Sequence, residues 1–131
     1  MRALIYQAII GDSTLNALGI TDDSAFAVDV DTPQNRPFLQ LRWGRNDVAL
    51  AKTEIGRRNL VIWVHDQPGD YTGIDSIIKR LRTLIPSLVP SSDAEGQLTA
   101  AEWAGDSEDL ADDGHRTIAR NISFVLVGSG Q

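Results

Sequence analysis

Hydrophobic residues recur at helical spacing in two parts of the chain. Residues 2–10 show the pattern briefly and predict a short N-terminal helix. The second part carries a continuous apolar stripe, begins with the capping-box pattern of Thr72 and Asp75, and stops at Pro86. We therefore predict a long amphipathic helix there. Its stripe consists of Ile74, Ile77, Ile78, Leu81, Leu84 and Ile85.

Shorter apolar runs predict strands in the rest of the chain. Residues 25–30 have the composition of a short edge strand, and residues 38–43 alternate in polarity. Residues 98–105 and 116–128 are expected to form a closing β-hairpin joined by an acidic connection. The strongest strand pattern is residues 59–65.

The strand at residues 59–65 is apolar on both of its faces. One face carries Leu60, Ile62 and Val64, and the other carries Val61 and Trp63. A strand of this kind has to be covered twice. We expect the second cover to be either the N-terminal helix or a neighbouring subunit.

Together these elements predict an α+β fold in one domain, which the length of 131 residues fits. We expect a single antiparallel or mixed sheet of about four to five strands. The long helix would pack across one face of this sheet, and the short helix would precede it.

A basic segment between two glycines, residues 44–58, is either a long hairpin arm or a flexible loop. Four cations lie in it, interleaved with acidic residues. One interpretation is a docking arm for an acidic neighbour, and the other is a solvated arm. The cations are Arg45, Lys52, Arg57 and Arg58.

Composition narrows the classes of function. The net charge of −6 argues against a nucleic-acid grip, which needs basic surface. No apolar run has the length of a membrane span, and the apolar start lacks a signal cleavage site, so we expect neither a span nor a secretory signal. The absence of cysteine removes disulfides, thiolate chemistry and cysteine-based zinc sites.

The turn after the strongest strand, within "VIWVHDQPGDYTG" at residues 61–73, resembles the edge of an active site. However, it lacks the glycine–lysine pattern of a phosphate loop. His65 and Asp66 are adjacent on a strand, so their side chains should point to opposite faces. No nucleophile-elbow pattern accompanies them. We therefore expect a structural turn, no catalytic residues and no cofactor.

An acidic group in the connection between the last two predicted strands is the strongest metal candidate. Its spacing does not match a calcium loop, because no glutamate closes it. We expect a solvated acidic tip and no metal; a second acidic group at residues 22–31 is weaker. The first group consists of Asp106, Glu108, Asp109, Asp112, Asp113 and His115.

Three tryptophans, Trp43, Trp63 and Trp103, all fall on predicted strands. Tryptophans in such positions usually anchor a core or an interface. We expect that role here.

The chain resembles the tail terminator (tail completion) proteins of long-tailed bacteriophages. The resemblance lies in "ALIYQAIIGDSTLNALG", in "LVIWVHDQPGDYTGIDSIIKRLRTLI" and in "LTAAEWAGDSEDLADDGHRTIARNISFVLV". These segments give a helix with a leucine-rich turn, then a strand, polar turn and long helix, and then a hairpin whose first strand carries a tryptophan near an acidic loop. Residues 44–58 are not part of the resemblance.

The resemblance implies one tail-terminator-like domain over residues 1–131 and a structural virion protein without catalytic residues. Such a subunit would form a hexameric ring at the head-proximal end of the tail, after assembly in the host cytoplasm. It would bind tail tube protein on one side and a neck or head-completion protein on the other. DNA would pass through the ring without specific binding, which an acidic channel would suit.

Two other functions are consistent with the same sequence. Another head–tail connector, such as a stopper or adaptor, would bind filled heads instead of capping tubes. A small-molecule-binding α+β module would use the turn from Asp66 to Gly73.

Overall fold

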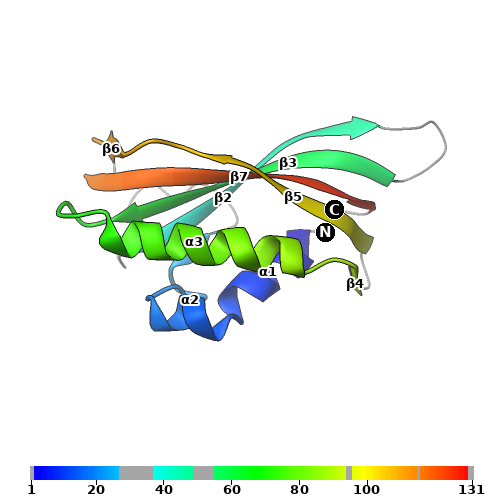
Figure 1. The fold of residues 1–131 in the computed structure, drawn as a ribbon, viewed down its shortest axis with the longest axis horizontal. Coiled ribbons are helices and arrows are strands. Elements are labelled where there is room, and N and C mark those ends of the chain that lie inside the picture. The colour runs from blue at the N-terminus through cyan, green and yellow to red at the C-terminus, as the bar shows by residue number, and fades with distance from the viewer. Residues whose placement is uncertain (1, 27–36, 49–54, 94–95, 115, 130–131) are drawn as a thin grey trace.

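The computed structural model describes residues 2–26, 37–48, 55–93, 96–114 and 116–129 (Figure 1). The described part of the chain contains three helices and seven strands. The helices are α1 (Arg2–Ile10), α2 (Ser13–Ala17) and α3 (Thr72–Ser87). The strands are β1 (Ala25–Phe26), β2 (Phe38–Val48), β3 (Ile55–Asp66), β4 (Ser91–Asp93), β5 (Gly96–Asp106), β6 (Leu110–Asp112) and β7 (Thr117–Ser129).

All seven strands belong to one mixed sheet, with the order β1-β2-β3-β7-β5-β4 and with β6 also paired to β7. Strand β1 is parallel to β2, and the other pairs are antiparallel. The predicted fold class is therefore wrong. The molecule is mainly a curled seven-stranded sheet, and not a sheet of four to five strands under a long helix.

Two causes account for the missing strands. Strands β4 and β6 have three residues each, too few to show a period of two in the sequence. They lie in segments that composition alone would assign to loops, one after α3 and one in the acidic connection. Tertiary pairing with β5 and β7 makes them strands.

The antiparallel pair of β3 and β7 forms the centre of the sheet. The two strands pair continuously from Ile55↔Ser129 to Asp66↔Ile118 without a register shift. Both outer neighbours, β2 and β5, contain shifts, and at one of them Gly105 has a φ of 136°. Bulges in the flanking strands increase local twist, which agrees with the crossing of the strands in Figure 1.

One face of the sheet carries the hydrophobic core. Alternate residues of β3 and β7 are fully buried there, including Leu60, Ile62 and Phe124. The helices α1, α2 and α3 all lie on this side (Figure 1). The helical stripe predicted from the sequence is confirmed, because all six of its residues are buried against the sheet.

We call the opposite face of the sheet, away from these helices, the outer face. Val61 and Trp63 of β3 lie there and are half-buried. Because α1 packs on the core side with Ile5 and Ile9, the N-terminal helix does not provide the second cover of β3. The other cover expected from the sequence, a neighbouring subunit, stays a prediction.

The predicted capping box at the start of α3 is wrong. The N-cap is Tyr71, which makes no side-chain capping hydrogen bond, and Thr72 is already in the helix. Instead, Asp75 accepts a hydrogen bond of 2.7 Å from Nη1 of Arg120 on β7. Pro86 lies inside the last turn of the helix. The helix ends at Ser87, one residue after the predicted stop at Pro86.

Asp12 joins two helices through a single carboxylate. It is the N-cap of α2, where it accepts a hydrogen bond of 3.0 Å from the backbone N–H of Leu15. It also accepts two hydrogen bonds from Arg80 of α3, at 3.0 and 2.7 Å. The hydrogen bonds from Arg80 lower the pKa of Asp12 below its ordinary value of 3.8, although burial acts in the opposite direction.

Replacing Asp12 with alanine should lower the free energy of unfolding by at least the value of a lost N-cap, about 1 kcal/mol. Asp12→Ser keeps a capping oxygen but loses the Arg80 pair, so its loss should be smaller. Urea unfolding of the three proteins measures both effects. Equal stability of all three would contradict this role of Asp12.

The contribution of Asp12 to the free energy of unfolding should also depend on pH. Because the folded-state pKa is lowered, the stabilisation is complete above about pH 4 and is lost as the pH falls through the lowered pKa. The difference in unfolding midpoint between wild type and Asp12→Ser should therefore shrink below pH 4. A difference that stays constant from pH 7 to pH 3 would contradict the assignment.

Candidate functional site

The basic segment forms a hairpin arm at its described ends. Strands β2 and β3 remain paired out to Val48↔Gly56, which supports the hairpin alternative over a flexible loop. Arg45 lies in β2, and Lys52 falls outside the described residues. Arg57 and Arg58 lie on β3 with opposite orientations, Arg57 exposed on the outer face and Arg58 buried on the core side.

Arg58 is part of the packing of the arm. Its guanidinium lies 5.1 Å from the centre of the Trp43 ring, and its Nη2 donates a hydrogen bond of 3.3 Å to the carbonyl of Gly44. Burial, and then the nearby charge of Arg2, lower the pKa of Arg58. Trp43 thus anchors the core side of the arm, and Arg57 is the exposed charge of the pair.

His65 lies in a closed aromatic setting at the end of β3. Its ring stacks on Phe38 at 4.5 Å, and its Nδ1 is 2.8 Å from Oγ1 of Thr117. Oδ2 of Asp112 is 3.9 Å from the same Nδ1 atom. His65 is 1% exposed and Thr117 is 3% exposed.

This geometry favours a structural role for His65. In a relay for nucleophilic catalysis, the hydroxyl and the carboxylate contact different ring nitrogens. Here, both Thr117 and Asp112 approach Nδ1, and burial closes the ring from substrate. The opposite orientation predicted for His65 and Asp66 is confirmed, since Asp66 faces Gly73 on the side of α3.

The turn from Asp66 to Gly73 uses its polar groups internally. Asp66 accepts a hydrogen bond of 2.7 Å from the N–H of Gln67, and Asp70 accepts one of 3.1 Å from Thr72. The hydroxyl of Tyr71 donates to the carbonyl of Leu110, which ties the turn to β6. These contacts explain the local sequence without a ligand.

The acidic connection is organised around one cation, Arg120. Its guanidinium contacts three carboxylates: Asp75 at 2.7 Å, Asp106 at 3.8 Å and Asp109 at 3.9 Å. Its Nε also donates to the carbonyl of Ser107. The connection is thus tied to β7 and α3 through Arg120, while Glu108 and Asp113 are exposed, as expected of a solvated tip.

Arg120 was not predicted as this centre, although it interrupts the row of apolar residues on one face of the last strand. Among the described residues, no group of three or more His, Cys, Asp or Glu side chains is arranged to hold a metal ion. His115, Asp29 and Asp31 fall outside the described residues.

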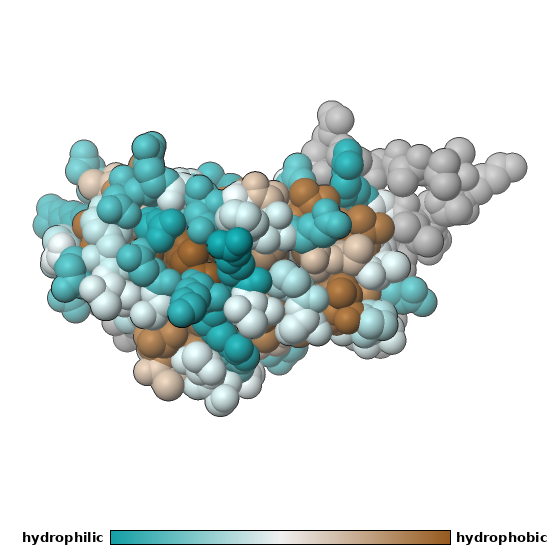
Figure 2. Space-filling model, viewed as in Figure 1, coloured by the Kyte–Doolittle hydropathy of each residue, from teal (hydrophilic) through white to brown (hydrophobic). Residues whose placement is uncertain are grey.

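Trp103 is the exposed tryptophan, with 40% of its surface accessible. Arg82 of α3 lies over its ring at 3.7 Å, and its indole N–H donates a hydrogen bond of 2.8 Å to Asp106. Polar residues gather over α3 and near β6 in Figure 2, with hydrophobic ones in small separate groups. Trp103 therefore fits a surface anchor better than a core residue.

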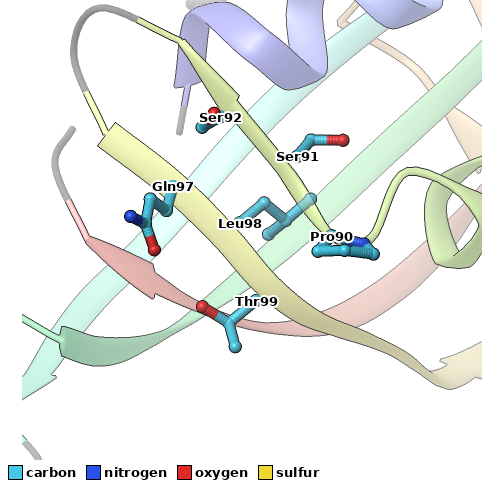
Figure 3. Close-up of a pocket in the computed structure, with 6 residues that line it drawn as sticks. All are labelled: Pro90, Ser91, Ser92, Gln97, Leu98 and Thr99. Atoms are coloured by element: carbon cyan, nitrogen blue, oxygen red, sulfur yellow. The ribbon is translucent and has the colours of Figure 1, made fainter.

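A shallow hollow of about 390 Å³ lies at the β4 end of the sheet, far from the turn that follows β3 (Figures 1 and 3). Its polar side chains point in different directions instead of converging on a ligand position. The described lining is Pro90, Ser91, Ser92, Gln97, Leu98 and Thr99.

Also among the described residues, no helix is both long enough and apolar enough to cross a membrane.

No protein-family model matches the chain, and no curated protein matches it either. The fold is similar to a chain in a structure described as the virion of a native gene transfer agent (GTA) particle. The TM-score is 0.76 at 17% sequence identity, and the match covers 99% of this chain and 95% of that chain. At this identity the comparison establishes a shared fold.

The structural interpretation of His65 predicts the effect of Thr117→Val. Removing the buried hydroxyl at Nδ1 should lower the free energy of unfolding by about 1–2 kcal/mol. The matched control is Thr99→Val on β5, an exposed threonine whose loss should have little effect. Urea unfolding measures both. Equal stability of Thr117→Val and wild type would contradict a structural contact.

Proposed function

We propose that this chain is a structural virion protein, the tail terminator subunit of a phage-like particle. In this role it forms a hexameric ring at the head-proximal end of the tail, stops tube growth and joins the tail to the head. Its partners are further copies of itself, the tail tube protein and a neck protein. The proposal includes no catalytic step and no cofactor.

The similarity in fold to the chain from the gene transfer agent virion is the main support. The similarity covers nearly the whole of both chains, so it concerns the complete domain and not one part of it. The matched chain comes from a virion particle, which is the setting that the family resemblance of the sequence also implies. Two independent lines, sequence pattern and fold, therefore favour the same class of protein.

The described side chains are consistent with a protein that acts by binding. Polar residues at the end of β3 are engaged in internal contacts, as with His65 and Thr117. Meanwhile, β3 keeps apolar residues on the outer face, and the arm presents Arg57. In a ring subunit, heterologous contacts between copies would cover such surfaces. The net charge of −6 would suit a channel that DNA passes without binding.

Tube capping is the direct test of this proposal. Purified tail tube protein is polymerised with and without the chain, and tube lengths are measured by negative-stain electron microscopy. A terminator should shorten the tubes and appear as a ring at one end. Tubes of unchanged length and bare ends would overturn the proposal, and binding to filled heads instead would favour a stopper.

The arm gives a more specific prediction. Arg57→Glu should weaken tube or neck attachment while leaving the fold intact, because Arg57 is exposed. Lys79→Glu on α3 is the matched control, since it makes the same charge reversal at an exposed position. Co-sedimentation with tubes and with neck protein measures attachment. If both variants attach as well as wild type, Arg57 has no role in docking.

A further inference from the structure

Arg82 and Trp103 form an exposed pair at the side of the sheet where α3 packs against β5. The guanidinium of Arg82 lies 3.7 Å from the centre of the Trp103 ring, and Trp103 is 40% exposed. The indole N–H donates a hydrogen bond of 2.8 Å to Oδ1 of Asp106, which holds the ring in one orientation. The cation is therefore supported by a fixed aromatic surface. We call this pair the Arg82 edge.

A stacked guanidinium is suited to binding a carboxylate. Stacking uses the flat face of the group, whereas its N–H donors lie in the plane of the group and stay available. Within the described part of the chain, Arg82 has no hydrogen bond or ion pair to a carboxylate. An arginine already held on a ring also loses less side-chain freedom when it binds. The chemistry of the Arg82 edge thus favours an acidic partner.

An exposed carboxylate lies at the opposite side of the sheet. In the strand order, β1 is the outermost described strand on one side, whereas β5 and β4 are outermost on the other. Asp22 is exposed in the turn that precedes β1. The sequence around it is acidic, because residues 3–35 include five aspartates but no lysine or arginine. We call the turn with Asp22 the Asp22 edge.

We propose that the Arg82 edge of one copy binds the Asp22 edge of a second copy, with the guanidinium paired to the carboxylate. Each copy then offers two different edges, so the contact is heterologous and is repeated from copy to copy. A repeated contact of this kind closes into a ring when the rotation between neighbours allows it. This inference rests on the proposed function, because it names the two surfaces that join neighbouring subunits of the hexameric ring.

The contact uses side chains and not added strands. A register shift between Trp103 and Gly105 interrupts the regular row of backbone groups on β5 at this point. Tryptophan and arginine, in contrast, are among the residue types that most often carry the binding energy of protein interfaces. The Arg82 edge is therefore better suited to a side-chain contact with a copy than to pairing with an incoming strand.

Charge reversal at each edge tests the pairing. Arg82→Glu should weaken self-association by more than about tenfold, because it places two carboxylates against each other. Asp22→Arg should weaken it to a similar extent, because it places two cations together. Both positions are exposed, so each variant should fold, which circular dichroism checks. Light scattering over a range of concentrations, alone and with tail tube protein, measures the assembly.

Mixing the two variants gives the decisive measurement. In an equal mixture of Arg82→Glu and Asp22→Arg, copies that alternate around an even-numbered ring restore opposite charges at every contact. Association should therefore recover to nearly the strength of wild type. Native mass spectrometry should find mixed rings with equal numbers of the two variants. A mixture that assembles no better than either variant alone would overturn the pairing of Arg82 with Asp22.

Lys79→Glu is the matched control for Arg82→Glu. It makes the same charge reversal at an exposed cation of α3, one helical turn before Arg82, and should associate nearly as wild type does. Trp103→Ala should weaken association several-fold, because it removes the surface that holds Arg82. If Arg82→Glu and Lys79→Glu associate equally strongly, the stacked pair has no specific part in the contact and the inference is wrong.

The outcomes separate this inference from the proposed function. If wild type forms rings and Arg82→Glu forms them equally well, the inference fails and the tail terminator proposal stands. If Arg82→Glu forms normal rings that no longer bind tubes, the Arg82 edge binds tube protein and not a copy. If wild type does not assemble either alone or with tubes, both proposals fail.

Discussion

The uninterrupted pairing of β3 with β7 determines the rest of the structure. Twelve consecutive residue pairs align the two strands, so the apolar core positions of both, such as Leu60, Ile62 and Phe124, fall on one face. A slip of one residue would turn that whole row of side chains toward the outer face. Helix α3 packs directly against this row, α1 and α2 pack against β1 and α3, and the other strands extend the sheet on either side. The functional surfaces are consequently positioned relative to these two strands.

Around this centre, charged groups hold the helices and the connection in place. Asp12 joins α2 to the middle of α3 through Arg80, and Arg120 joins β7 to Asp75 in the first turn of α3. Both cations are on elements that also contribute to the hydrophobic core. The helical layer is thus fixed by apolar packing along α3 and by ion pairs at the middle and the first turn of that helix. In the described ranges of the chain, all three helices lie on the core side and none lies on the outer face.

The sequence predicts the local elements better than their assembly. The stripe from Ile74 to Ile85 and the strand predicted at residues 59–65 depend on nearby residues along the chain, and both elements are confirmed. The number of strands was wrong because β4 and β6 are formed by pairing with distant strands. The start of α3 was also wrong, because the ion pair of Asp75 with Arg120 joins residues far apart in sequence.

The same distinction applies to the candidate site. Opposite orientations of His65 and Asp66 follow from strand geometry, so they could be predicted, whereas the partnership of His65 with Thr117 could not. Likewise, Arg57 and Arg58 look equivalent in the sequence, yet the structure buries only Arg58 against Trp43.

The bulges in β2 and β5 have a consequence for how the protein behaves at high concentration. The strands β1 and β4 cover only two and three residues of these neighbours, so long stretches of backbone lie toward the sides of the sheet. A flat strand in that position is a template for amyloid-like growth. Displaced residues at each bulge break the regular row of N–H and C=O groups that an incoming strand would need. Such irregular sides would let the protein reach high concentration without aggregating through its strands.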